Sequence, residues 1–384
     1  MLKAAIVGCG KIADNHAEQI RRIPGAQIVA ACDREPLMAR QICDRFQIPR
    51  QFTDLGKLLT ECHPQVVHIT TPPQSHFAIG KQCLESGANI YVEKPFTVTG
   101  RETEQLVALA EEKRLKLTAG HDLQFTPVAR RMRQLVASGY LGGAPVHIES
   151  YYCYELENAT YAKALLANSD HWVRQLPGKL LHNIISHGIA RIAEFLETDR
   201  PEVFARAYIS PLLRSLGECE IYDELRVVIT ENSRLSAYFT FSSQMRPGLN
   251  GLRIFGPRNG LALDQEQETV VKLPGQRLKS YLEKFIPQWR HAGWQVLNSL
   301  GNINLFLHRD FQMKSGMKHL IEQFYRSIAA DSSVPISYRE ILRTAFIMDR
   351  IFEQAGESLR GHISTGALEL PGPPHLYQTR LTTV

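Results

Sequence analysis

A glycine-rich turn near the N-terminus has the residue types and spacing that hold a pyrophosphate group. The segment lies between an apolar run typical of a strand and an amphipathic stretch typical of a helix, and it reads Gly8-Cys9-Gly10-Lys11-Ile12-Ala13. Gly8 permits a tight turn, Gly10 lets the main chain approach a phosphate, and Ala13 allows close packing of helix and strand. The helix N-terminus supplies free amides and partial positive charge. The pattern predicts a dinucleotide site; the alternative is a glycine turn that binds no ligand.

The end of the second predicted strand carries an acidic residue where a ribose would lie. Asp33 follows the glycine turn by about twenty residues, the spacing expected of a residue that binds the ribose hydroxyls. A carboxylate there repels a 2′-phosphate, so Asp33 favours NAD. Arg34 could instead bind that phosphate. We therefore expect NAD, with NADP as the alternative.

Short apolar runs alternate with helical patterns in the first part of the chain. The predicted strands are Ala4–Val7, Ile28–Ala31, Val66–Ile69, Ile90–Val92 and Leu115–Ala119. The amphipathic stretches between them are Ile12–Ile23, Leu37–Phe46, His76–Ser86 and Glu102–Lys113. This rhythm predicts right-handed crossovers and a parallel sheet with helices on both faces, that is, a Rossmann domain over residues 1–122.

The rhythm changes after a predicted helix that begins at Pro127. Seven strand-like stretches follow, with one helix around Asn183–Leu196 among them and two more, Met317–Ala330 and Tyr338–Ala355, near the end. These patterns predict an α+β domain over residues 123–370 with a large, mostly antiparallel open sheet. We expect the Pro-rich residues 371–384 to form a loose tail. The predicted fold class is α/β.

Composition excludes several classes of protein. The 384 residues carry a formal net charge of +5, which is mild and spread along the chain, so we expect no nucleic-acid partner. The seven cysteines are scattered without a CxxC pair, which argues against a zinc ribbon or a disulfide framework, and we expect no metal. There is no long apolar run and no signal-peptide pattern. A cytoplasmic location fits best, and membrane contact is not expected.

Several motifs in a fixed order together resemble the Gfo/Idh/MocA family (glucose–fructose oxidoreductase, inositol dehydrogenase and rhizopine catabolism). They are the N-terminal GCGKIA, Thr70-Thr71-Pro72-Pro73-Gln74-Ser75-His76, Glu93-Lys94-Pro95, and Gly120-His121 followed by Phe125 and Pro127. The resemblance covers essentially the whole chain. It implies a Rossmann domain followed by an α/β domain whose open sheet lines the substrate pocket and often forms subunit contacts. We accordingly expect a homodimer or homotetramer.

The resemblance also implies roles for two of these motifs. The Thr71-Pro72 turn and His76 are expected to lie beside the cofactor, as is Glu93. Lys94 is expected to reach both the nicotinamide ribose and the substrate, where its charge would stabilise a developing alkoxide. The alternative is that Glu93 and Lys94 form an exposed turn pair.

The family's second catalytic element is an Asp-x-x-x-His pair on a helix of the second domain. His187 matches the histidine, whose ordinary pKa suits proton exchange, but Asn183 stands in place of the aspartate. An asparagine can orient a ligand but cannot carry a proton. The proton chemistry is then expected to depend on Lys94 and His187. His182 points about 100° away from this face and is a poor substitute.

The loop before this helix resembles one that borders the substrate. Trp172 offers an apolar face for a sugar ring, and Arg174 and Lys179 could bind a phosphate or carboxylate. An anionic or nucleotide-linked sugar is therefore a candidate substrate. A solvated basic loop is the alternative.

Residues 277–318 mix basic residues with large apolar ones. Such a segment can lie on a membrane surface or cover a lipid-linked substrate. We favour an insertion that packs on its own or a partner subunit, because Pro287, Gly293 and Gly301 interrupt the helical period.

Three functions remain open at this point. The leading hypothesis is an NAD(P)-dependent oxidoreductase that transfers hydride between nicotinamide and a secondary hydroxyl or keto group of a sugar, sugar acid, polyol or nucleotide sugar. The second is a glycoside hydrolase that oxidises its substrate transiently. The third is a non-catalytic dinucleotide-binding sensor, which Asn183 favours and Lys94 and His187 oppose.

Overall fold

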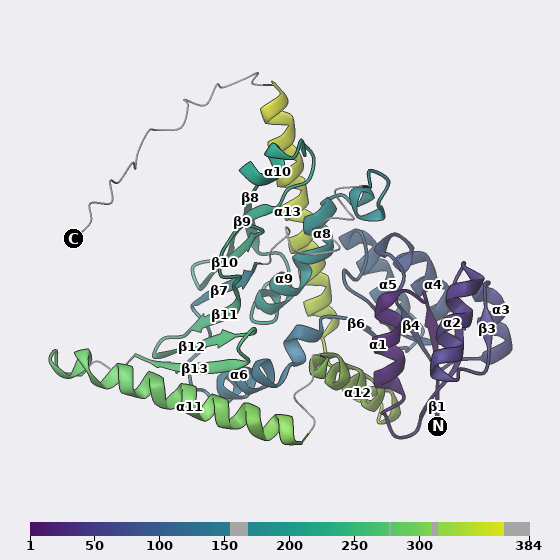
Figure 1. Ribbon diagram of the computed structural model, residues 1–384, viewed down its shortest axis with the longest axis horizontal. Coiled ribbons are helices and arrows are strands. Elements are labelled where there is room, and N and C mark those ends of the chain that lie inside the picture. The colour runs from purple at the N-terminus through teal and green to yellow at the C-terminus, as the bar shows by residue number, and fades with distance from the viewer. Residues whose placement is uncertain (154–167, 276–277, 309–313, 365–384) are drawn as a thin grey trace, which may run out of the picture.

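Two sheets make up most of the chain. The computed structural model describes residues 1–153, 168–275, 278–308 and 314–364. The N-terminal sheet and its helices lie at the right of Figure 1, the second sheet lies toward the left, and α13 (Tyr338–Ser364) runs between them. Within the described residues, no helix combines the length and hydropathy that crossing a membrane requires.

The N-terminal sheet has the order β3-β2-β1-β4-β5-β6, and all of its strand pairs are parallel. The strands are β1 (Leu2–Val7), β2 (Ala26–Cys32), β3 (Gln51–Phe52), β4 (Val66–Ile69), β5 (Asn89–Val92) and β6 (Leu117–Ala119). The connecting helices are α1 (Lys11–Ile20), α2 (Pro36–Phe46), α3 (Leu55–Cys62), α4 (His76–Glu85) and α5 (Gly100–Glu112). The strand order reverses between β1 and β4, and ligands bind at such switch points. This topology confirms the predicted Rossmann domain.

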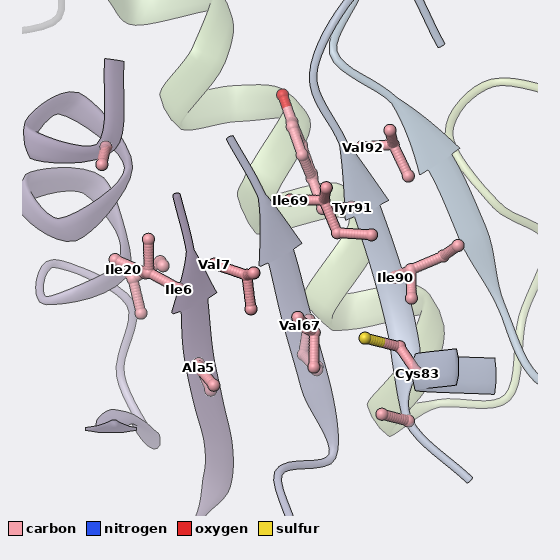
Figure 2. Packing of buried hydrophobic residues seen from close by; sticks show 14 of the residues in the cluster. Ala5, Ile6, Val7, Ile20, Val67, Ile69, Cys83, Ile90, Tyr91 and Val92 are labelled. Carbon is pink, nitrogen blue, oxygen red and sulfur yellow. The ribbon is translucent and has the colours of Figure 1, made fainter. Parts of the chain in front are cut away.

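The central strands of this sheet are mostly apolar. Ile6 on β1, Val67 and Ile69 on β4, and Ile90 and Tyr91 on β5 are fully buried, and Figure 2 shows their side chains on neighbouring strands. Burying an aliphatic side chain of this size contributes roughly 1.5–3 kcal/mol. The sheet is therefore a rigid support for the loops at its ends.

The second sheet has the order β13-β12-β11-β7-β10-β9-β8. Its strands are β7 (His147–Tyr152), β8 (Glu202–Tyr208), β9 (Glu224–Glu231), β10 (Leu235–Ser242), β11 (Asn250–Phe255), β12 (Asn259–Asp264) and β13 (Thr269–Pro274). Only β7 and β10 pair in parallel; the other pairs are antiparallel, as predicted. Side chains of α9 (Ser186–Ala193) and α13 share a buried apolar cluster with this sheet. Phe204, Val228 and Tyr238, in contrast, are exposed.

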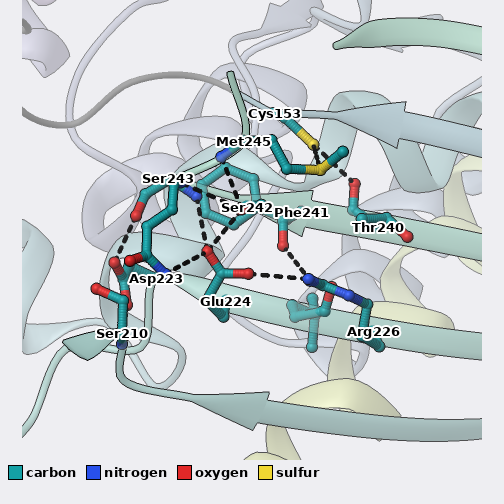
Figure 3. A network of polar contacts seen from close by, with 12 residues as sticks. Cys153, Ser210, Asp223, Glu224, Arg226, Thr240, Phe241, Ser242, Ser243 and Met245 are labelled. Carbon is teal, nitrogen blue, oxygen red and sulfur yellow. Dashed lines mark hydrogen bonds and ion pairs between the residues drawn. The ribbon is translucent and has the colours of Figure 1, made fainter. Parts of the chain in front are cut away.

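A network of buried polar groups joins β9 to the end of β10 (Figure 3). Asp223 accepts from the Ser210 main-chain N–H (2.7 Å) and from the Ser243 hydroxyl. Glu224 accepts from the Ser242 hydroxyl (2.6 Å) and pairs with Arg226 (3.0 Å). Asp223 and Glu224 are thus buried with several donors each.

Helix α12 (Ser315–Ala329) packs on the N-terminal domain although it follows the second sheet in sequence. Met317, Leu320, Phe324 and Tyr325 are buried in the same apolar cluster as the N-terminal strands. Ile351, on the later part of α13, is instead buried with the second sheet. The C-terminal helices therefore contribute to both cores.

Two helix predictions were wrong in detail. The predicted helix Asn183–Leu196 is two shorter ones, α8 (Lys179–Ile184) and α9, separated at Ile185. The predicted interruptions at Pro287, Gly293 and Gly301 do not occur, because α11 (Ile286–Leu307) is continuous. Pro287 lies in the first turn, where no N–H is needed, and an interior glycine costs only about 1 kcal/mol. The predicted tail, residues 371–384, lies outside the described residues.

Candidate functional site

Polar side chains gather at the carboxyl ends of the parallel strands. The strand ends are followed by Gly8 after β1, Asp33 after β2, Thr71 after β4, Glu93 after β5 and Asp122 after β6. Parallel strands place all of these positions at one edge of the sheet, and this edge faces ligands in doubly wound folds. The Rossmann topology thus brings together residues more than a hundred positions apart.

The glycine turn has the shape that a pyrophosphate requires. Gly8 has φ +92°, and a Cβ atom there would lie 2.6 Å from Cγ2 of Thr71, so a larger residue is excluded. A Cβ atom at Gly10 would meet no atom within 4 Å, so open space lies beside this main chain. No side chain accepts from the first-turn amides of α1; of these, the Ala13 amide donates to the Gly10 carbonyl (2.9 Å). Ala13 is buried, Ile12 is half-buried and Lys11 is exposed.

Asp33 is held in a fixed orientation at the end of β2. Its Oδ2 accepts from the Cys9 main-chain N–H (2.6 Å), and its Oδ1 accepts from the N–H of Glu35 (2.9 Å). The carboxylate is half-buried, so oxygen lone pairs remain for ribose hydroxyls. Arg34 is exposed.

His76 joins two turns that carry predicted site residues, Thr71-Pro72 and Glu93-Lys94-Pro95. Its Nε2 lies 2.7 Å from the Thr71 carbonyl oxygen, and its Nδ1 lies 3.0 Å from that of Pro95. The ring is fully buried, and burial lowers its pKa. Pro72 is exposed at the tip of its turn. His76 thus holds the two turns in a fixed position relative to each other.

Glu93 is the end of a buried chain of hydrogen bonds that crosses the N-terminal domain. Its Oε1 lies 2.9 Å from His16 Nε2, and His16 Nδ1 lies 2.8 Å from His68 Nδ1. His68 Nε2 lies 3.0 Å from the hydroxyl of Tyr325 on α12. His68 also stacks on Tyr91, with ring centroids 4.9 Å apart.

Protonation states in this chain follow from burial. Burial, and then the neighbouring His16, hold the pKa of His68 well below its usual range, so its ring is neutral. Burial raises the pKa of Glu93, but the hydrogen bond and charge of His16 and the charge of Lys94 outweigh it, and the net shift is downward. With Glu93 ionised and His68 neutral, one donor order satisfies every contact: Tyr325 donates to His68, His68 to His16, and His16 to Glu93.

Lys94 extends from the N-terminal domain to the second domain. Its Nζ donates to the main-chain oxygen of Asn183, at 3.1 Å. Asn183 lies in the last turn of α8, where carbonyl groups lack helical partners and can accept from a side chain. Burial lowers the pKa of Lys94, while the Glu93 and Asp122 carboxylates act in the opposite direction. The lysine is therefore half-buried between the domains with its amine oriented by a main-chain group.

His187 lies in the first turn of α9 and faces groups from both domains. Its Nδ1 is 3.9 Å from Oδ1 of Asp122, and its ring centroid is 6.0 Å from those of both His121 and Tyr152. Burial, followed by the charge of Lys94, holds the pKa of His187 well below its usual range. The imidazole is thus neutral at pH 7 and able to accept a proton.

Asp122 is an acidic residue of this cluster that was not predicted from the sequence. Burial and the Glu93 carboxylate raise the pKa of Asp122 to about 6. It directly follows the Gly120-His121 motif, so an acidic residue at that place was the available signal. Neither ring nitrogen of His121 has a hydrogen-bond partner among the described residues, and burial lowers the pKa of that ring to about 4. The site therefore contains a carboxylate and neutral imidazoles that the rest of the chain does not saturate.

Comparison with known proteins identifies the family of the N-terminal domain. The family described as the oxidoreductase family with an NAD-binding Rossmann fold, Gfo/Idh/MocA, matches residues 2–121. Residues 2–121 belong to the Gfo/Idh/MocA oxidoreductase family. The N-terminal domain is therefore an NAD-binding Rossmann domain, and the glycine turn, the open space at Gly10 and the oriented Asp33 fit this dinucleotide.

Two curated relatives from the same comparison carry names of sugar dehydrogenases. The UDP-N-acetylglucosamine 3-dehydrogenase of Acidithiobacillus ferrooxidans is 28% identical over 149 residues, 39% of this chain and 44% of that enzyme. A D-apiose dehydrogenase of Paraburkholderia graminis is 28% identical over 140 residues, 36% of this chain and 37% of that enzyme. The chain therefore matches less than half the length of either relative.

The structural similarity covers a larger share of the chain than the sequence similarity does. A structure of the Acidithiobacillus ferrooxidans enzyme has a TM-score of 0.70 at 19% identity and covers 93% of this chain and 99% of that chain. The WlbA dehydrogenase of Bordetella pertussis, solved with NADH and UDP-GlcNAcA, has a TM-score of 0.71 at 14% identity and covers 93% and 96%. The two-domain fold is thus shared with these two dehydrogenases.

The loop before α8 contacts the N-terminal domain through Trp172. Trp172 lies in η3 (Trp172–Gln175), and its carbonyl oxygen accepts from Gln74 Nε2 (2.8 Å), beside the Thr71-Pro72 turn. Arg174 pairs with Glu218 (2.6 Å) and Lys179 with Glu220 (2.5 Å). These ion pairs hold the loop to residues 218–220, so roles for Arg174 and Lys179 in substrate binding stay a prediction.

Proposed function

We propose that this chain is an NAD-dependent oxidoreductase that acts on a secondary hydroxyl or keto group of a sugar-like substrate. The observation that carries the proposal is the meeting of Lys94 and Asp122 with His187 of the second domain at the carboxyl edge of β5 and β6, the sheet edge that also carries the glycine turn. A cation, a neutral base and a carboxylate there are the groups that removing a proton from a hydroxyl requires.

The residues divide the proton chemistry between them. His187 is neutral and accepts the hydroxyl proton, and the Asp122 carboxylate, 3.9 Å from Nδ1, stabilises the resulting imidazolium. Lys94 stabilises the negative charge that develops on the substrate oxygen. Asp122 thus compensates for the aspartate that Asn183 replaces in the family pattern. Bound NAD supplies the hydride acceptor or donor.

The glycine turn and Asp33 are the residues that would hold the dinucleotide. The α1 N-terminus would bind the pyrophosphate, and Asp33 would bind the ribose hydroxyls. Glu93 and His76 contribute indirectly, because their hydrogen bonds hold the turns that carry Lys94 and Thr71 in place.

A nucleotide-linked or acidic sugar is the substrate class that we favour. Two of the relatives above, the UDP-N-acetylglucosamine dehydrogenase and WlbA with UDP-GlcNAcA, carry such ligands in their names. The neighbouring Trp172, Arg174 and Lys179 offer an apolar ring and two cations on one loop. We also propose a reducing, cytoplasmic location, which the seven free cysteines support.

The first test is to denature freshly purified protein, identify the released small molecules by mass spectrometry, and then follow absorbance at the nicotinamide band with a panel of nucleotide sugars, sugar acids and polyols. Net reduction or oxidation of the cofactor is the expected result. Turnover of a glycoside without a net change in absorbance would indicate the hydrolase. Dinucleotide binding without turnover of any substrate would indicate the sensor.

Cofactor preference has its own test at Asp33. Because its carboxylate repels a 2′-phosphate, NAD is expected to bind more tightly than NADP, and Asp33→Ala is expected to lower NAD affinity about tenfold, the effect of losing roughly 1.4 kcal/mol of charged hydrogen bonds. Isothermal titration of both cofactors measures this. Arg34→Ala is the matched control; a larger loss of NADP affinity than of NAD affinity in that variant, with NADP the tighter ligand of the wild type, would reverse the assignment.

A further inference from the structure

A cavity lies at the domain boundary, among α5, α8, α9 and α13, which Figure 1 shows near one another. Its walls come from both domains: residues 95–100, which follow Lys94, form one side, and Ala345 and Met348 of α13 form another. The volume of the cavity is about 30 Å³. One water molecule needs roughly 10–15 Å³ measured in the same way, so the cavity has room for about two.

Three residues that line this cavity have polar atoms without a partner. Both ring nitrogens of His121, Nδ1 of His182 and the hydroxyl of Ser186 make no hydrogen bond to any described residue. Each of the three residues is 2% exposed. Leaving a buried polar group unpaired is costly, and a polar cavity of sufficient size usually supplies water as the partner. The lining of the cavity therefore indicates a site for water.

The cavity also extends to the surface of the molecule. Among its lining residues, Thr99 at the N-cap of α5 is exposed and Asp349 of α13 is half-buried. The Asp349 carboxylate accepts from the main-chain N–H of Gly100 (2.8 Å), which holds the two helices together at this opening. The same cavity is thus lined by His121 in the interior and by Thr99 at the surface.

The inner part of the cavity adjoins His187, to which the proposed function assigns the substrate proton. Ser186 directly precedes His187, and the rings of His121 and His187 are in a T-shaped arrangement with centroids 6.0 Å apart. A direct contact or one bridging water spans such a separation. His187 is buried, and a bound substrate and cofactor cover it further. A proton that His187 accepts therefore stays there until product release unless the interior offers a route.

We propose that this cavity is a water-filled passage through which the substrate proton leaves His187 for solvent, with His121 as the relay residue; this assignment rests on the proposed function. During oxidation the substrate O–H bond breaks and its proton passes to His187, while the hydrogen on carbon leaves as hydride to bound NAD. A neutral imidazole has one accepting and one donating nitrogen, so His121 takes a proton from His187 on one nitrogen and releases one to water from the other. The waters pass one proton on toward Thr99, and each relay group ends with the charge with which it began. Reduction of a keto group uses the same steps in reverse.

Ala345 allows the passage to be closed without removal of a polar group, because it lines the cavity from α13. Ala345→Leu is expected to fill the space that water would occupy, and Ala345→Ser, the matched control, to leave it open. Stopped-flow absorbance follows the first turnover of the full chain with NAD and UDP-N-acetylglucosamine, or a faster substrate from the panel above, and a dissolved pH indicator reports proton release. In the wild type and Ala345→Ser both signals should rise at one rate. In Ala345→Leu hydride transfer should keep that rate, while proton release slows about tenfold or more.

A crystal structure at a resolution that shows ordered water is the second measurement, and it needs no substrate. Water within hydrogen-bond distance of His121, His182 or Ser186 is expected in the wild type and not in Ala345→Leu. A dry cavity in the wild type, two signals that stay together in Ala345→Leu, or an equal delay in Ala345→Ser overturns the passage. If the wild type oxidises and reduces no substrate of the panel, the proposed function fails and the relay with it. If circular dichroism shows Ala345→Leu to be unfolded, His182→Phe replaces it with the same expected delay, because it removes Nδ1 but keeps a ring to stack on Phe352.

Discussion

Two buried polar clusters in this molecule use their hydrogen-bonding groups in opposite ways. In the network of β9 and β10 (Figure 3), both carboxylates receive donors from hydroxyls, main-chain amides or Arg226. At the domain boundary, in contrast, His187 Nδ1 and both nitrogens of His121 have no hydrogen-bond partner among the described residues.

This difference indicates that the first cluster stabilises the fold and that the second is available to bind a molecule. A buried polar group without a partner costs about 1–3 kcal/mol, and a folded chain keeps such a cost where a ligand or water will supply the partner. The satisfied network of Asp223 and Glu224 stabilises the second sheet. The unpartnered nitrogens of His121 and His187 lie beside Asp122, where we propose that a bound molecule supplies the partner. The predictions that follow perturb one cluster or the other.

The largest effect is expected at Lys94. Lys94→Ala removes the cation beside the substrate oxygen, and turnover should fall about a thousandfold, which is the scale of losing electrostatic stabilisation of an oxyanion. NAD affinity and the thermal midpoint should change little, because the lysine makes its hydrogen bond to Asn183 of the other domain. Steady-state kinetics and cofactor titration measure both quantities.

Lys81→Ala is the matched control for this experiment, because Lys81 is an exposed lysine of the same domain, 3.9 Å from Glu85. It should retain full activity. Turnover by Lys94→Ala at the wild-type rate would remove Lys94 from the mechanism and leave Asp122 and His187 as its centre.

The opposite signature is expected in the satisfied network. Asp223→Ala leaves the Ser210 amide and the Ser243 hydroxyl without an acceptor, and the free energy of unfolding should fall by about 3 kcal/mol. Asp223→Asn keeps an acceptor oxygen and should cost less. Urea unfolding measures the loss, and turnover of the folded fraction should stay at the wild-type level. If Asp223→Ala lost activity without losing stability, the two clusters would not differ in role.

The pH dependence of turnover tests the role of Asp122 in the second cluster. Its pKa is raised to about 6, so its carboxylate is charged above that pH and protonated below it. The oxidation rate should therefore rise as pH increases through about 6, because only the charged form stabilises a protonated His187. Asp122→Asn should lower turnover about tenfold to a hundredfold and abolish this inflection. An inflection that persists in Asp122→Asn would assign it to another group.

The smallest effect is expected in the histidine chain. His68→Phe keeps the stacking partner of Tyr91 but removes one hydrogen bond each from His16 and Tyr325. Because this chain positions Glu93 and touches no substrate, turnover should fall at most about tenfold, with a shifted pH profile and unchanged NAD affinity. Tyr325→Phe, which removes only the last hydroxyl, should have a smaller effect. A loss as large as that of Lys94→Ala would place the chain in the chemistry itself.

The sequence predicted the N-terminal domain well because its signals are local. Gly8, Gly10 and Asp33 belong to one βαβ unit, and the apolar runs that form the parallel strands are bounded by turns. The same is true of the strand rhythm in the second domain. Local patterns of this kind need no knowledge of tertiary contacts.

The features that could not be predicted from the sequence depend on contacts between segments that lie far apart in it. His16 and His68 are 52 positions apart and meet because they lie on α1 and β4, and Tyr325 joins them from α12. Asp122 faces His187 only once the two domains are docked. No periodicity reports such contacts. The missing aspartate at Asn183 was visible in the sequence, whereas the carboxylate that we propose takes its place, that of Asp122, was not.

Helix α12 has a consequence for how the chain is made. Its apolar residues, among them Phe324 and Tyr325, complete the core of a sheet whose last strand ends at Ala119. During synthesis the ribosome must therefore extend the chain through the whole second sheet before the first domain can bury its remaining apolar face. A segment that is translated early waits for one that is translated late, and in that interval its uncovered surface is open to chaperones.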